Sequence, residues 1–148
     1  MCFKKHKNCF KMEERNVSTC IIFDKNKRIL LQKKTLDYPY WPDGPWLLPG
    51  GEIEKDETAE QAVIRELKEE LCNDFDVKFF KIIKFRNPNG FDVKENTFIS
   101  NFNKDISSIR INEGAGFAFF DISELNSINI IPFHFQIIKE YLKENHNT

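Results

Sequence analysis

Three glutamates recur at a spacing that places them on one side of a helix. Glu66, Glu69 and Glu70 stand at positions i, i+3 and i+4, and residues so spaced are neighbours on a helix surface. Like charges in this arrangement destabilise an isolated helix by about 0.3 kcal/mol per pair. Such a cluster suits a hard divalent cation, because Mg²⁺ takes oxygen ligands. A solvated helix face is the alternative that the spacing alone leaves open.

A helix is expected to carry these glutamates. Thr58 is followed three residues later by Gln61, a capping-box pattern that marks a helix start. Val63, Leu67 and Leu71 then recur at helical spacing and predict a buried stripe beside the acidic one. The glutamates would therefore project from a rigid element that is fixed against a core.

Around this helix, seven residues keep a wider fixed spacing: Gly51, Glu57, Arg65, Glu66, Leu67, Glu69 and Glu70. The spacing resembles the Nudix box, G-x5-E-x7-R-E-U-x-E-E-x-G-U with U an aliphatic residue, and meets seven of its nine specified positions. The preceding WLLPGG looks like the lead-in strand of the Nudix hydrolases. The later NEGAGFAFFDISEL is similar to the acidic loop and strand that close many of their sites.

This resemblance implies an α+β fold, an α/β/α sandwich with a mixed β-sheet between helices. It also implies hydrolysis of a pyrophosphate bond in a nucleoside diphosphate derivative, by attack of water at phosphorus with Mg²⁺ or Mn²⁺ as cofactor. The expected substrate is a nucleoside triphosphate or an oxidised nucleotide. ADP-ribose, dinucleoside polyphosphates and a catalytically silent nucleotide-binding or regulatory module remain alternatives.

The resemblance also implies roles for the residues of the box. Glu66 would serve as general base as well as metal ligand, while Arg65 and Glu57 would hold the glutamates in place. The metal ligands that it implies are the carboxylates of Glu66, Glu69 and Glu70 and the carbonyl oxygen of Gly50.

Two positions depart from the box. Cys72 stands where the family has glycine, and Asn73 replaces an aliphatic residue. The family glycine lies just past the helix end, where a left-handed backbone is convenient. Because Asn tolerates that conformation better than Cys, we expect the left-handed residue to shift to Asn73. The alternative is that Cys72 marks a copy that has lost catalysis.

Other candidates lie outside the box. Glu113, in a loop with two glycines, could supply a further acid to the site, or be an ordinary exposed glutamate. Lys33 could meet a substrate phosphate as a point charge, or be a solvated strand-end lysine. His134 is expected to be a packing residue.

Four aromatic residues flank a Pro- and Gly-rich loop just before the box: Tyr38, Tyr40, Trp41 and Trp46. Aromatic side chains stack on nucleobases and also fill hydrophobic cores. Trp41 and Trp46 are therefore candidate substrate-binding residues, and a hydrophobic plug is the equal alternative.

Alternation of apolar residues and turn residues predicts the other elements. A helix should begin at Pro132 and bury Phe133, Ile137, Ile138 and Tyr141. An irregularity is expected near Lys94. Strands are expected over residues 17–24, 28–33, 46–49, 77–86, 91–102 and 116–121.

Composition limits the class of protein. The 148 residues suffice for one domain, 1–148, in which 1–16 would be an N-terminal tail or an added strand. With 22 basic and 23 acidic residues, the net charge of −1 gives no overall attraction to nucleic acid. No apolar run approaches membrane-spanning length. Four cysteines without paired spacing suggest a reducing cytoplasm. A homodimer is possible, since many Nudix enzymes are dimers.

Overall fold

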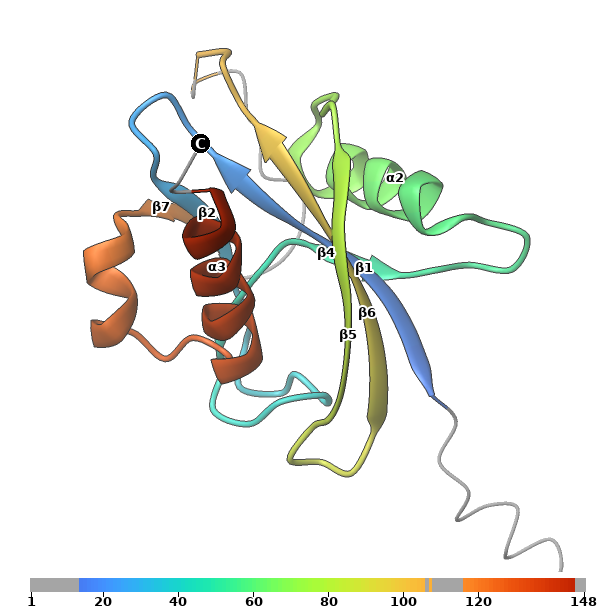
Figure 1. The fold of residues 1–148 in the computed structure, drawn as a ribbon. Helices are drawn as coiled ribbons and strands as arrows, with labels where there is room; N and C mark the ends of the chain where they lie inside the picture. Colours follow the sequence, from blue (N-terminus) through green and yellow to red (C-terminus); the bar gives the residue numbers. More distant parts are fainter. Residues whose placement is uncertain (1–13, 106, 108–115, 146–148) are drawn as a thin grey trace, which may run out of the picture.

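The computed structural model describes residues 14–105, 107 and 116–145. Within these residues, seven strands form one sheet, and two α-helices and a 3₁₀ helix accompany it (Figure 1). The strands are β1 (Arg15–Phe23), β2 (Ile29–Lys33), β3 (Trp46–Leu47), β4 (Gly50–Glu52), β5 (Lys78–Arg86), β6 (Asp92–Asn101) and β7 (Gly116–Phe120). The helices are α2 (Ala59–Leu71), η2 (Ile122–Ser127) and α3 (Pro132–Asn145).

The sheet is mixed. Its main path runs β3-β2-β1-β6-β5, with β4 added beside β1 and β7 beside β2. Strands β1 and β6 are parallel along their whole length, from the pair Arg15–Val93 to the pair Phe23–Asn101. The other pairings between named strands are antiparallel. Strand β1 is therefore the central strand, and it touches both the β4 segment and β6.

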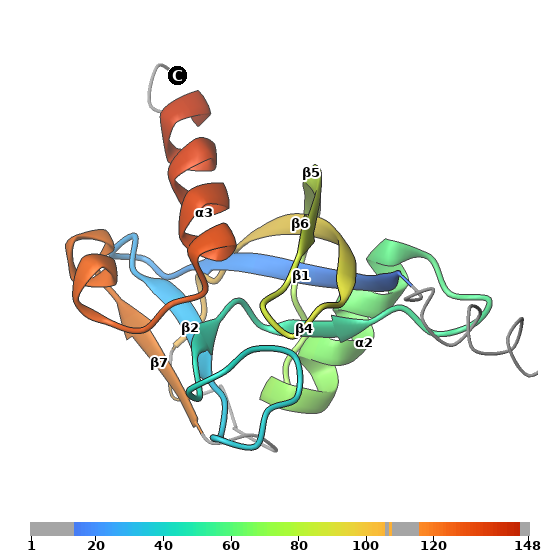
Figure 2. The same ribbon diagram turned by 90° about the horizontal axis from the view of Figure 1, so that it is seen from below.

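The two α-helices cover opposite faces of this sheet. Helix α2 lies on one side and α3 on the other, as the two perpendicular views show (Figures 1 and 2). The predicted α+β sandwich, with a mixed sheet between helices, is thus confirmed.

Both faces of β1 are buried, and successive side chains enter different cores. Ile21 joins the cluster beneath α3, whereas Ile22 joins the cluster beneath α2. Helix α3 contributes Ile137 and Ile138, and α2 contributes Val63, Leu67 and Leu71. The apolar stripe predicted for the acidic helix is therefore the surface that fixes α2 to the sheet.

Helix α2 begins as the sequence predicts and ends differently. The Thr58 side chain accepts a hydrogen bond from the Gln61 amide, and the Gln61 side chain accepts one from the Thr58 amide. At the other end Cys72 itself is left-handed, with φ 53° and ψ 39°, and its amide donates to the Lys68 carbonyl oxygen. The expectation that Asn73 takes this conformation was wrong. The left-handed residue thus stays at the position where the Nudix box has glycine. Because that residue is a cysteine here, the left-handed conformation costs more free energy than it would for glycine.

Other strand predictions need smaller corrections. Strand β6 runs unbroken through Lys94, and the irregularity in this hairpin lies on β5, between Phe79 and Lys81. Strand β1 begins at Arg15, so the last two residues of the predicted 1–16 tail belong to the sheet. None of the helices in the described ranges is long and apolar enough to cross a membrane.

Candidate active site

A cavity of about 260 Å³ opens beside the Gly50–Gly51 segment. Side chains from β1, from β6, from the 34–48 segment and from the start of α3 line it. Glu66 of α2 reaches the same cavity. The first of the three clustered glutamates therefore meets a hollow that is large enough to hold part of a small molecule.

The two glycines allow the backbone of β4 to pass unusually close to its neighbours. A Cβ at Gly51 would lie 2.4 Å from the Glu66 carboxyl carbon. A Cβ at Gly50 would lie 2.0 Å from the Ser18 carbonyl oxygen, and the φ of Gly50 is +147°. Gly50 is therefore needed for the backbone path itself, whereas Gly51 leaves room for the Glu66 carboxylate.

The guanidinium of Arg65 connects the glutamates of this region. Its Nε and Nη2 donate to the two carboxylate oxygens of Glu57, at 2.7 and 2.9 Å. Nη2 also donates to the Glu52 carbonyl oxygen at 3.0 Å. Nη1 donates to Glu66 at 3.0 Å and to both oxygens of Glu69 at 3.3 Å. The predicted role of Arg65 and Glu57, to hold the acidic residues in place, fits this geometry.

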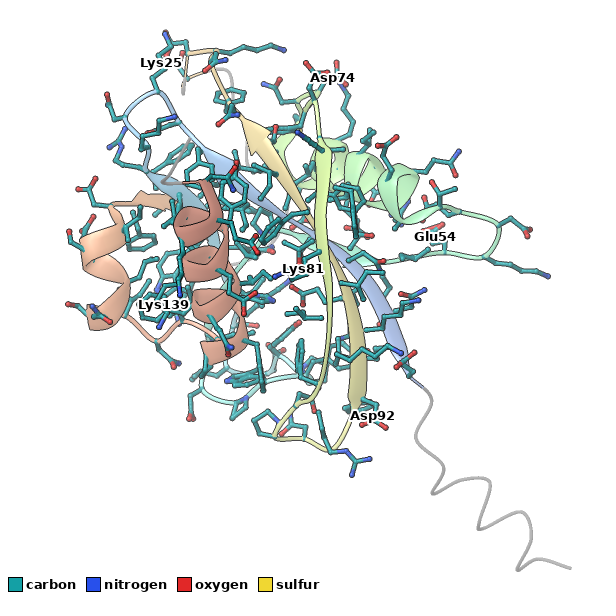
Figure 3. All side chains as sticks on the ribbon, in the orientation of Figure 1. Lys25, Glu54, Asp74, Lys81, Asp92 and Lys139 are labelled. Atoms are coloured by element: carbon teal, nitrogen blue, oxygen red, sulfur yellow. The ribbon has the colours of Figure 1, made fainter. Side chains whose placement is uncertain are left out.

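These contacts shift the pKa values of Glu57 and Arg65. Hydrogen bonds from Arg65, and then one from the Glu54 amide, lower the pKa of Glu57 from 4.5 to about 2. The same carboxylates raise the pKa of Arg65, Glu57 contributing most. Glu57 is thus ionised at any pH at which the protein would work. Glu54 lies in the loop between β4 and α2 (Figure 3), 3.4 Å from Nη1 of Arg65.

Glu69 and Glu70 differ in their surroundings although they are adjacent. The Glu69 side chain is about half exposed, whereas Glu70 is buried at 3% exposure. Across the residues that the structure describes, no three acidic, histidine or cysteine side chains converge as a ready-made metal cage. Glu66 and Glu69 instead share the Arg65 guanidinium.

The donor atoms nevertheless suit a hard divalent cation. Mg²⁺ binds carboxylate and backbone carbonyl oxygens. Because Gly51 has no side chain, the Glu66 carboxylate can lie close to the β4 backbone. The residues that would hold the ion are Glu66, Glu69, Glu70 and the carbonyl of Gly50.

The aromatic candidates separate into two groups. Trp41 lines the cavity together with Tyr38 and Tyr40, and burial raises the pKa of Tyr38. Trp46 instead packs edge-on against Phe120, with ring centroids 4.8 Å apart, and belongs to the apolar cluster beneath α3. Trp41 therefore lies on the cavity wall, whereas Trp46 packs against the core.

The cationic candidates separate as well. The Lys33 ammonium donates to the Gly44 carbonyl within the 34–48 loop, while its neighbour Lys34 lines the cavity. Arg15, which the sequence did not single out, also lines the cavity. Its guanidinium lies 3.4 Å from the centre of the Tyr40 ring and pairs with Glu52. The remaining candidate, Glu113, lies outside the described residues.

Sequence reasoning missed a buried polar group on the cavity wall. Glu95 of β6 is 2% exposed, and its carboxylate accepts a hydrogen bond from the Thr19 hydroxyl at 2.8 Å. Nε2 of His134 lies 2.9 Å from the same carboxylate, and Nδ1 accepts from the Leu48 amide at 3.0 Å. His134 is buried as expected, but it is also a hydrogen-bonded wall of the cavity.

Comparison with known proteins gives consistent results. The NUDIX domain model matches residues 12–141. A nucleoside triphosphatase, NudI, of Enterobacter sp. (strain 638) is 30% identical over 137 residues, which are 93% of this chain and 88% of that protein. An 8-oxo-dGTP diphosphatase of Proteus vulgaris is 36% identical over 56 residues, 38% of this chain and 48% of that protein.

Solved structures show the same fold. The crystal structure of a MutT protein from Methanosarcina mazei Go1 superimposes with a TM-score of 0.76, at 17% identity, over 93% of this chain and 99% of that one. At such low identity the superposition speaks for the fold alone. It places this mixed sheet, with helices on both faces, among architectures already seen by experiment.

Proposed function

The chain belongs to the Nudix hydrolase family, and from that premise we propose that it cleaves a pyrophosphate bond in a nucleoside triphosphate or an oxidised nucleotide, with Mg²⁺ as cofactor. The observation that carries the proposal is the set of Arg65 hydrogen bonds, which joins Glu57 and Glu69 to Glu66, the glutamate that lines the cavity. A merely solvated acidic face would not need a guanidinium at its centre.

In this proposal the chain prepares the reacting groups before the substrate arrives. The Arg65–Glu57 contact fixes the guanidinium, which in turn orients Glu66 and Glu69. Glu66, next to the cavity, is the group that would accept the proton of the attacking water. Mg²⁺ held by Glu66, Glu69, Glu70 and the Gly50 carbonyl would supply charge neutralisation at the phosphates and a more acidic coordinated water.

Other residues that line the cavity would bind the rest of the nucleotide. Trp41, Tyr38 and Tyr40 offer aromatic surface on which a base can stack. Arg15 and Lys34 offer positive charge on the same wall, which suits an anionic substrate. Aromatic and cationic groups in the cavity, together with the Glu66 carboxylate, match the base and the phosphates of a nucleotide.

Two features support a nucleotide with a terminal phosphate chain as the substrate. The relative that aligns over most of both chains is named a nucleoside triphosphatase, and the shorter match is to a protein named for 8-oxo-dGTP. A catalytically silent module is the less favoured reading, because every carboxylate of the box is present.

The proposal is tested by incubating the protein with a panel of nucleotides, with Mg²⁺ or with EDTA, and separating the products. The panel comprises the eight common nucleoside and deoxynucleoside triphosphates, 8-oxo-dGTP, ADP-ribose and a diadenosine polyphosphate. Release of a nucleoside monophosphate and pyrophosphate from a triphosphate, only with Mg²⁺, is the expected result. Turnover confined to ADP-ribose or the dinucleotide would overturn the substrate class, and no turnover of any compound would overturn the activity.

A further inference from the structure

Among the residues that the structure describes, the buried Glu95 carboxylate has hydrogen-bond acceptor capacity beyond what its partners use. A carboxylate offers about four lone-pair sites and no donor when ionised. The Thr19 hydroxyl and His134 Nε2 account for two of those sites. Glu95 also lines the cavity that Glu66 reaches. A ligand in this cavity would therefore meet an acceptor-only group with room for more hydrogen bonds.

The neighbours of Glu95 fix its character as an acceptor. The Leu48 amide donates to Nδ1 of His134, so that nitrogen carries no hydrogen and Nε2 must carry one. Nε2–H and the Thr19 hydroxyl then both donate to the carboxylate. The carboxylate is thus held in one orientation by donors from β1 and α3.

From this geometry, and resting on the proposed nucleotide substrate, we infer that Glu95 selects the base by pairing with two adjacent N–H donors. A carboxylate pairs well with two parallel donors. Among the four standard bases, guanine alone presents a ring N–H beside an exocyclic amine. Adenine and cytosine each set an acceptor nitrogen beside their amine, which would face the carboxylate lone pairs. Glu95 is therefore a specificity-determining residue for a guanine-type base.

Glu95 is not expected to distinguish guanine from 8-oxoguanine. Oxidation of guanine at C8 leaves the ring N–H and the exocyclic amine in place. Glu95 therefore treats guanine and 8-oxoguanine alike, and any preference between them arises elsewhere on the cavity wall. The stacking surfaces of Trp41 and Tyr40 accept any base, so the discrimination between bases rests on the polar wall.

The test measures base binding without catalysis. Calorimetric titration of the protein in EDTA with GMP, AMP, CMP and UMP gives the affinity ratio directly. We expect GMP to bind most tightly, and Glu95→Gln to reduce its advantage over AMP by at least about 100-fold, because a site built for N–H donors discriminates strongly. An unchanged ratio in Glu95→Gln, or no GMP preference in the unaltered protein, would overturn the inference.

Two further variants keep this test interpretable. Thr97→Val alters a buried hydroxyl on the same strand that has no hydrogen-bond partner among the described residues, and it should leave the GMP preference unchanged. Thr19→Val removes one donor to Glu95 and should weaken the preference even if Glu95→Gln does not fold. If Glu95 had a purely structural role, Glu95→Gln would lower the melting temperature and leave the ratio of the GMP and AMP affinities unchanged. That result would also overturn the inference.

Failure of the inference and failure of the proposed activity give different results. Glu66→Gln should lower turnover by at least about 100-fold and keep the GMP preference, since Glu66 lies on α2 and makes no hydrogen bond to the Thr19–Glu95–His134 group in the contacts described above. Turnover of all bases at similar kcat/KM would refute the role of Glu95 alone. GMP preference without turnover of any triphosphate would refute the activity alone.

Discussion

Arg65 and Glu57 face each other in a bidentate pair, with Nε–Oε2 and Nη2–Oε1 separations of 2.7 and 2.9 Å. The two residues are eight positions apart, one in the loop before α2 and one in its second turn. Parallel donors and acceptors make this the most directional kind of ion pair in proteins. It leaves Nη1 free to reach Glu66 and Glu69, so the pair is the anchor of the whole acidic group.

Arg65→Lys should lower kcat/KM by about 10- to 100-fold, because lysine cannot reproduce the fork that orients Glu66 and Glu69. Steady-state kinetics with the best nucleotide of the panel measures the effect. Arg86→Lys is the matched control, since Arg86 makes a similar forked pair with Asp92 beside the exposed β5–β6 turn. Equal kinetics for both variants would contradict a positioning role for Arg65.

The Glu57 carboxylate gives stability a defined dependence on pH. Folding lowers its pKa from 4.5 to about 2, so its contribution to the free energy of unfolding is complete above about pH 4.5. That contribution is lost as the pH falls from 4.5 towards 2. Glu57→Gln should therefore be less stable than the unaltered protein at neutral pH and show a shallower decline over this range.

Urea unfolding at several pH values between 6 and 2.5 measures this difference. Glu60→Gln makes the same change of charge at an exposed position of the first turn of α2 and should follow the unaltered protein. A Glu57→Gln curve parallel to that of the unaltered protein throughout the range would contradict the shifted pKa.

Alanine substitution should affect stability and kcat differently at the two glycines of β4. In Gly51→Ala the new Cβ meets the flexible end of Glu66, so the fold should survive while displacement of the carboxylate lowers kcat by about 100-fold. In Gly50→Ala it meets the Ser18 backbone at a φ of +147°, so stability should fall by more than about 2 kcal/mol. Melting curves and steady-state kinetics of both variants measure these effects. A large loss of stability in Gly51→Ala, together with unchanged stability in Gly50→Ala, would contradict the roles assigned to the two glycines.

Cys72 adopts a left-handed conformation that favours glycine. Cys72→Gly should raise the free energy of unfolding by about 1 kcal/mol, with little effect on turnover, because the acidic residues lie earlier in the helix. Asn73→Gly is the control and should not stabilise the protein. A large gain in turnover for Cys72→Gly would instead mean that Cys72 impairs catalysis, as the hypothesis of a silent copy requires.

The sequence predicted most of the fold because its signals were local. The Thr58–Gln61 cap and the Val63–Leu67–Leu71 stripe depend on residues within a few positions of each other, and both are present. The end of α2 was predicted wrongly, because residue preference for the left-handed region favoured Asn73. In the structure the helix ends at Cys72, directly after the buried Leu71, and the Asn73 side chain accepts a hydrogen bond from the Asp74 amide instead.

The residues of the candidate site were likewise predictable only where the signal was local in the sequence. The acidic residues keep a fixed spacing on one helix, so the sequence alone singled them out. The Glu95–His134 contact joins positions 39 residues apart, and no local pattern connects a strand glutamate to the start of a distant helix. Lys33 and Trp46 were chosen by residue type, and the structure turns the first toward the Gly44 carbonyl and the second into the core.

The most direct test of the central claim is the rate of nucleotide hydrolysis against Mg²⁺ concentration, for the unaltered protein and for Glu66→Gln. Gln has nearly the helix propensity of Glu, so α2 should remain folded, and circular dichroism would verify this. We expect the rate to rise with Mg²⁺ and saturate in the unaltered protein, and to be at least about 100-fold lower in Glu66→Gln. Equal rates in the two proteins, or a rate indifferent to Mg²⁺, would contradict it.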